Sequence, residues 1–179
     1  MASAITHFIV GAGLALPCME LAALRAVMPR WAIPVTAGLF AVVPDLDTWA
    51  TLTFHIPRGS LFSHRGFFHS PFFLALLALA VASLVARGRA VLLLAAVWAG
   101  AAITHPLLDV LTDGGSGVMV LFPFSTERFF FPWRPIRVSP LSIGRFFDHA
   151  GEILWSELPF SVAAMLLGLA IRGMTLRRD

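Results

Sequence analysis

Acidic residues and histidines stand at the margins of the apolar segments of this chain. The set comprises His7, Asp45, Asp47, His64, His69, His105, Asp109, Asp113, Asp148, His149 and Glu152. Such groups are costly to bury in apolar surroundings unless they pair with one another or bind a metal ion. Imidazole nitrogens and carboxylate oxygens are also common ligands of zinc. These residues are therefore the first candidates for a functional site.

The strongest local pattern is His105-Pro-Leu-Leu-Asp109. Residues four apart lie on one face of a helix, so His105 and Asp109 can bind one divalent ion together, and Asp113 continues the spacing. In the alternative, the two aspartates cap the helix end or hydrogen-bond to loop backbone, which Gly114-Gly115 would favour. The pattern alone leaves both interpretations open.

Two histidines five residues apart, His64 and His69, bracket Arg65 just before an apolar segment. A lone histidine here is best explained as a hydrogen-bonded group at the membrane surface. Two histidines that approach His105 favour metal ligation instead. Arg65 can make a bidentate contact with a phosphate or a carboxylate, and its alternative role is that of an interfacial anchor.

Asp45 and Asp47 follow the second apolar segment, where they need a partner. Ordinary turn chemistry explains such a pair in a soluble protein. At the end of a membrane segment, we expect these carboxylates to bridge metal ions or to provide a general base. His7, just before the first segment, is a further candidate ligand.

Asp148, His149 and Glu152 precede the last apolar segment. Glu152 is a candidate metal ligand, whereas acids that favour the helix dipole are the alternative, above all for Asp148. His55 has no partner at ligand spacing and is left out.

The composition indicates a membrane-embedded protein of one domain, residues 1–179. Hydrophobic residues make up 58% of the chain and charged residues 13%, against roughly 45–50% and about 25% in average soluble domains. The net charge of +3 comes from arginines that form no basic run, so nucleic-acid binding is not expected. The single Cys18 excludes a disulfide framework. No serine lies in a Gly-x-Ser-x-Gly pattern, which disfavours a serine hydrolase.

The chain is predicted to form an all-α, membrane-embedded bundle of four to five apolar helices. The apolar segments are Phe8 to Leu24, Trp31 to Val43, Pro71 to Ala86, Ala90 to Thr104 and Pro159 to Ile171. Arg87-Gly88-Arg89 is too short for anything but a tight hairpin, which brings His69 near His105. The same up-and-down order gathers all the candidate residues at one end of the bundle.

Between the fourth and fifth segments, Pro106 to Leu158 is predicted to be a long, less regular stretch with an aromatic- and arginine-rich centre. Such a composition suits the headgroup level of a bilayer. Seven arginines lie at the end of the bundle remote from the candidate residues, and six lie at the end that holds these residues. The positive-inside rule then favours an extracytoplasmic site.

Taken in order, His7, Pro44-Asp45-Leu-Asp47, His64-Arg65-Gly-Phe-Phe-His69-Ser70 and His105-Pro-Leu-Leu-Asp109 resemble the YdjM-like family. Its members are bacterial inner-membrane proteins, described as LexA-regulated and thought to be metal-dependent hydrolases. The family is considered distantly similar to zinc-dependent phospholipase C and the S1/P1 nucleases, helical enzymes with up to three zinc ions.

The resemblance implies that His7, Asp45 or Asp47, His69 or His64, and His105 with Asp109 are metal ligands. The late His-x-x-x-Glu pair of those enzymes is replaced by Asp148-x-x-x-Glu152, and their terminal-amine ligand has no counterpart here. One to three divalent ions, most simply zinc, are therefore expected.

The sequence and the resemblance together predict a multi-pass inner-membrane hydrolase of phosphoesters that acts through metal-activated water. The expected substrate is a phospholipid or a lipid-linked headgroup from the surrounding bilayer. Asp45 or Asp47 would serve as base and Arg65 would bind the phosphoryl oxygens. An ion or metal transporter and a non-catalytic membrane scaffold are the alternatives.

Overall fold

The structure, a computed structural model, describes residues 1–140 and 143–177. Its long helices are α1 (Ala4–Ala15), α3 (Ala32–Val42), α5 (Pro71–Val85), α6 (Arg89–Asp109) and α7 (Ile143–Leu176). The short ones are η1 (Leu16–Glu20), α2 (Ala22–Arg25), η2 (Val43–Asp45), α4 (Leu46–Thr53) and η3 (Phe67–His69). Only isolated β-bridges occur in the described part of the chain. The predicted all-α class is confirmed.

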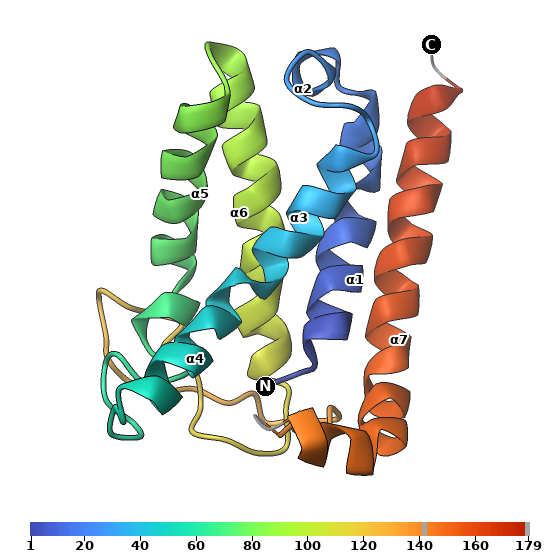
Figure 1. The fold of residues 1–179 in the computed structure, drawn as a ribbon. Coiled ribbons are helices and arrows are strands. Elements are labelled where there is room, and N and C mark those ends of the chain that lie inside the picture. Colours follow the sequence, from blue (N-terminus) through green and yellow to red (C-terminus); the bar gives the residue numbers. More distant parts are fainter. Residues whose placement is uncertain (141–142, 178–179) are drawn as a thin grey trace.

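Helix α1 packs against both α3 and α7, and α6 packs against α3 and α5 (Figure 1). Small residues allow these close contacts, because they let helix backbones approach one another in an apolar environment. A methyl group added at Gly11 of α1 would collide with the side chain of Ala41 in α3. One added at Gly168 of α7 would overlap the carbonyl of Gly13.

The predicted hairpin between α5 and α6 is confirmed. Only residues 86–88 separate the two helices, and Gly88 adopts a φ of +56°, which a residue without a Cβ tolerates best. At the far end of the pair, the rings of His69 and His105 lie 4.8 Å apart. The hairpin therefore places the two histidines together, as the segment order predicts.

Two helices can cross a membrane by length and composition, namely α6 and the Gly144–Leu176 part of α7. Helices α1, α3 and α5 are apolar but shorter than the roughly 20 residues of a straight span. Large apolar side chains such as Leu84, Leu92 and Leu166 are exposed on the outside of the bundle. This surface suits contact with lipid.

Two predicted elements differ from the structure. The first apolar segment is not one helix, because α1 ends at Ala15 and the 3-10 helix η1 follows from Leu16, with Pro17, which lacks an amide hydrogen, as its second residue. The stretch predicted to be irregular up to Leu158 becomes helical at Ile143. Its hydrophobic residues recur at helical spacing between polar ones, a pattern that contains no long apolar run.

Candidate metal centre

Six of the predicted ligands come together at one end of the bundle, beside the start of α1. They are His7 in α1, Asp45 at the end of η2, His64 in the following loop, His69 at the end of η3, and His105 and Asp109 in the last turns of α6. Five separate parts of the chain thus contribute to one cluster. We call these six residues the metal-ligand cluster.

Three groups within this cluster have one potential ligand atom per residue, all within 4.8 Å of one another. They are His7 with Asp45 and His105, Asp45 with His64 and His69, and His69 with His105 and Asp109. Because Asp45, His69 and His105 each belong to two groups, the six residues form one connected set. Such a set has the donors that zinc prefers in proteins.

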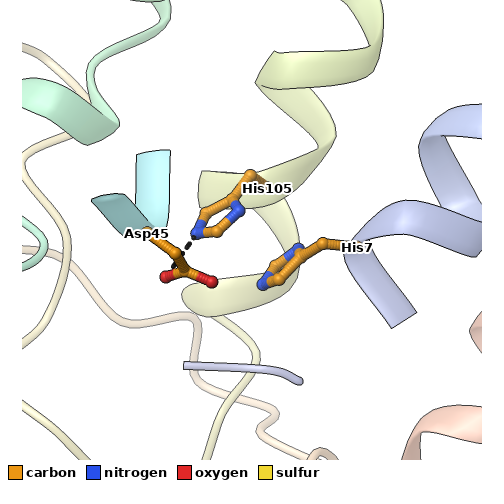
Figure 2. A group of neighbouring side chains, drawn as sticks. All are labelled: His7, Asp45 and His105. Atoms are coloured by element: carbon orange, nitrogen blue, oxygen red, sulfur yellow. Dashed lines mark ion pairs between the residues drawn. The ribbon is translucent and has the colours of Figure 1, made fainter. Parts of the chain in front are cut away.

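Figure 2 shows the first group, in which the three side chains point toward one another. His105 Nε2 lies 3.3 Å from Asp45 Oδ1, and the rings of His7 and His105 stack with their centroids 3.6 Å apart. His105 Nδ1 donates a hydrogen bond to the carbonyl of Ala41 at 2.7 Å. This contact orients the imidazole so that Nε2 faces the cluster, as outer partners do at metal sites.

The cluster also contains an unusual concentration of buried polar atoms without hydrogen-bond partners. They include both nitrogens of His7 and His69, both carboxylate oxygens of Asp45, and Nε2 of His64 and His105. In the described part of the chain, the other such atoms are one oxygen of Asp47, Ser60 Oγ and Arg128 Nε. Buried polar atoms are normally paired, and each unpaired one has a cost. Metal ligation would satisfy one nitrogen of each of these histidines together with the oxygens of Asp45.

Asp47 contacts the Nδ1 side of two histidines and belongs to none of the three ligand groups. His64 Nδ1 donates to Asp47 Oδ1 at 2.7 Å, and His69 Nδ1 lies 3.1 Å from Asp47 Oδ2. A carboxylate on Nδ1 leaves Nε2 available for a metal and fixes the direction of the ring. The geometry therefore gives Asp47 an orienting position.

The charge states of the groups outside the spanning helices suit metal binding. Burial raises the pKa of the Asp45 carboxyl, but the neighbouring His105 and His7 outweigh this effect and lower the pKa below its usual range. Burial likewise raises the pKa of Asp47, and contacts with His64 and His69 lower it overall. Burial lowers the pKa of His69. At neutral pH, the carboxylates are thus ionised and this imidazole is neutral, the forms that bind metals.

Arg65 is buried and its guanidinium group is bound within the protein. Nε donates to Asp109 Oδ2 at 2.9 Å, Nη1 to the carbonyl of Gly114 at 2.9 Å, and Nη2 to Thr112 Oγ1 at 2.8 Å. The Arg65 backbone has a φ of +65°, which costs a residue with a Cβ roughly 1 kcal/mol or more. Arg65 was expected to bind phosphoryl oxygens, whereas here all three nitrogens have protein partners.

Gly115 makes room for this guanidinium group. It has a φ of +98°, and a methyl group at this position would lie 2.5 Å from Arg65 Nη1. The Gly114-Gly115 pair, which by sequence favours a simple helix end, thus accommodates a buried arginine beside the cluster. Asp109 also accepts a hydrogen bond from the backbone amide of Ala2 at 2.7 Å. It therefore binds backbone, as the alternative interpretation expects, and also belongs to the cluster.

The late acidic group does not join the cluster. Asp148, His149 and Glu152 are exposed in the first turns of α7, and none belongs to a group with ligand spacing among the described residues. Asp113 accepts the amide hydrogen of Val138 at 2.8 Å. The alternative prediction of loop binding is therefore confirmed for Asp113.

Glu157 is a buried carboxylate that residue spacing does not identify. It accepts hydrogen bonds from the backbone and hydroxyl groups of Ser3 and from Thr6 Oγ1, the last at 2.7 Å. These contacts attach α7 to the first turn of α1, which carries His7. An acid inside a membrane helix is the signal that marks it, but the run of apolar residues predicts a segment that starts two residues later, at Pro159.

A cavity of about 890 Å³ opens beside the cluster, and we call it the vestibule. Its walls are α4, the loop around Arg58, the loop after α6, the segment 137–140 and the first turns of α7. His64 and Arg65 also line it. The vestibule thus reaches the metal-ligand cluster at His64, whose side chain is 12% exposed, whereas His7, His69 and His105 are fully enclosed.

Comparison with known proteins identifies a family for this chain. Residues 1–177 match the family described as YdjM inner membrane protein. The inner membrane protein YbcI of Escherichia coli (strain K12) is 34% identical over 144 residues, which cover 76% of this chain and 78% of YbcI. No solved structure matches the chain significantly, and the distant similarity to zinc-dependent phospholipase C and nucleases stays a prediction. The chain belongs to the YdjM family of bacterial inner membrane proteins.

Proposed function

We propose that this protein is a membrane-bound, metal-dependent hydrolase of phosphoesters. The observation that carries the proposal is the set of buried, unpartnered nitrogen and oxygen atoms of the metal-ligand cluster. A protein gains nothing from leaving so many polar atoms unpaired in one place. A divalent ion of the zinc type fits the mixture of imidazole and carboxylate donors.

The ligands in this proposal are the six cluster residues. His7, Asp45 and His105 would hold one ion, and Asp45, His64 and His69 would hold another, with Asp45 shared between them. Asp109 offers a further carboxylate beside His69 and His105. The expected number of ions stays at one to three. Glu152 is left out because its exposed side chain lies in the vestibule wall.

When bound, the metal would supply Lewis-acid charge and make water acidic enough to act as a nucleophile near neutral pH. The protein contributes orientation and charge. Asp47 directs His64 and His69, and the Ala41 carbonyl directs His105. Arg65 holds Asp109 in place.

Hydrolysis is favoured over a purely structural metal site by the vestibule. Catalytic zinc sites keep an open position, whereas structural sites are closed by protein ligands. The vestibule offers access at the His64 edge, and Arg58, Arg137 and Arg145 in its wall suit a phosphate-bearing substrate. We expect this substrate to be a phospholipid or a lipid-linked headgroup.

We further propose a multi-pass topology with the site on the extracytoplasmic side. Figure 1 shows α2, the α5–α6 turn and the C-terminal end of α7 at the end of the bundle remote from α4. Those parts carry Arg25, Arg87, Arg89 and Arg172. Arginine-rich ends of membrane helices favour the cytoplasm.

The test combines metal analysis with an activity assay on purified protein in detergent micelles. We expect inductively coupled plasma mass spectrometry to find zinc or manganese, and hydrolysis of bis(p-nitrophenyl) phosphate and phospholipids to stop in excess chelator and return with added metal. His105→Ala should lose metal and activity, whereas His55→Ala, an exposed histidine outside the cluster, should keep both. Metal-free protein with full activity in chelator would overturn the proposal.

A further inference from the structure

The vestibule wall contains more arginines than carboxylates. Its arginines are Arg58, Arg65, Arg137 and Arg145, and its carboxylates are Asp113 and Glu152. Arg65 is bound by Asp109, and Arg137 is bound by Asp113 at 3.1 Å. Neither Arg58 nor Arg145 forms an ion pair with any residue that the structure describes.

The two unpaired arginines come from different parts of the chain. Arg58 lies in the loop after α4, and Arg145 lies in the first turn of α7. On α7, Arg145, His149 and Glu152 are spaced four and three residues apart, so they share one helix face, and all three line the vestibule. His64 of the cluster lines the same cavity. A ligand held by Arg58 and Arg145 can therefore extend to the edge of the metal centre.

Exposed aromatic side chains on the helices that form the vestibule wall suit a position at the level of lipid headgroups. Trp49 in α4, Phe54 directly after it, and Phe147 and Trp155 in α7 each have more than 60% of their surface exposed, and both helices also contribute residues to the vestibule wall. Tryptophan and other aromatic rings gather at membrane–water interfaces. The cavity volume also lies in the usual range for small-molecule sites, about 300–1,000 Å³.

We propose that the vestibule is an anion subsite in which Arg58 and Arg145 bind a phosphate-bearing group of the substrate that is distinct from the phosphoester at the metal centre. This inference rests on the proposed function, because the subsite would select hydrolase substrates that carry a second anionic group besides the phosphoester that is cleaved. A lipid headgroup and a soluble phosphate ester share this chemistry. Guanidinium groups bind phosphate through paired, charge-assisted hydrogen bonds.

The first arm of the test measures binding without the metal centre. Full-length protein in phosphatidylcholine nanodiscs is stripped with EDTA and titrated with inorganic phosphate by calorimetry. Arg58→Gln and Arg145→Gln should each weaken phosphate binding about tenfold, the loss of one charge-assisted contact. Glu152→Gln should strengthen phosphate binding about two- to threefold, because it removes from the wall a negative charge that repels phosphate. The matched controls are Arg25→Gln and Arg87→Gln at the opposite end, which should stay within twofold of the parent.

The second arm identifies the source of the anion. Native mass spectrometry counts the lipid retained after incubation with phosphatidic acid or with phosphatidylcholine. Preferential retention of phosphatidic acid, lost in Arg58→Gln and kept in Arg58→Lys, supports a lipid headgroup. Phosphate binding without this lipid preference supports a soluble ester.

Two results would overturn the subsite. One is phosphate binding in Arg58→Gln and Arg145→Gln that equals the parent's. The other is phosphate binding that appears only after metal is restored, because the anion then sits at the metal centre. Metal content reports separately on the proposed function and should be the same in these variants as in the parent.

Discussion

The partnership of Arg65 with Asp109 gives the sharpest test of how the candidate site is built. Arg65 donates from three nitrogens to a carboxylate, a hydroxyl and a carbonyl, and its side chain is 2% exposed. Lysine keeps the charge but offers one compact group in place of a planar fork. Arg65→Lys therefore keeps at most the contact with Asp109 and loses the other two.

Each lost hydrogen bond from a charged donor is worth about 1.5 kcal/mol at the lower limit. Arg65→Lys should thus lower the free energy of unfolding by about 3 kcal/mol. Arg137→Lys is a matched control, because Arg137 also binds an aspartate, at 3.1 Å, but its side chain is 63% exposed. An exposed pair contributes at most about 1 kcal/mol, so the control should lose less than this.

The measurement is an SDS titration of purified protein in detergent micelles, followed by the fluorescence of its five tryptophans. EDTA is present throughout, because bound metal would add its own stabilisation. If Arg65→Lys loses no more stability than Arg137→Lys, the guanidinium group is not held as described. Lost hydrolysis with unchanged stability would instead favour the phosphoryl-binding role that the sequence suggested.

Three further predictions use the same preparations. Asp45→Asn should remove bound metal, because Asp45 belongs to two ligand groups, whereas Asp47→Asn should retain metal with an affinity about 10–100-fold weaker. Mass spectrometry measures the metal content and dye competition measures the affinity. Equal content and affinity in both variants would contradict this prediction. Glu157→Gln should cost about 1–3 kcal/mol in the SDS titration, because a buried charged acceptor is lost, and an unchanged midpoint would speak against it. Gly115→Ala should cost more than about 1 kcal/mol, because its φ is +98° and the methyl group would meet Arg65; a neutral effect would rule out this packing.

Much of the candidate site was predictable because it depends on the order of segments along the chain. A short turn at Arg87-Gly88-Arg89 forces α5 and α6 to run antiparallel, so His69 and His105 must meet at the other end. His7 and Asp45 follow from the same up-and-down order. Covalent connectivity and the apolar character of the segments suffice for this inference.

The roles of individual polar groups were less predictable. Spacing made Asp47 and Arg65 look like residues that contact the substrate or the metal. The structure places Asp47 on the Nδ1 side of two histidines and directs Arg65 toward Asp109. Which atom of a side chain faces a partner depends on ring orientation and backbone φ, and residue spacing does not specify these quantities.

By itself, the sequence determined the membrane-embedded helical class, the five apolar segments and the end of the bundle at which the ionisable residues gather. These properties depend on hydrophobicity and on the length of each connection. Only the tertiary structure decided that Glu152 lies in the vestibule and outside the cluster, and that Glu157 attaches α7 to α1. Both outcomes depend on how α7 packs, because the rotation of this helix about its axis sets which carboxylate faces α1 and which faces the cavity.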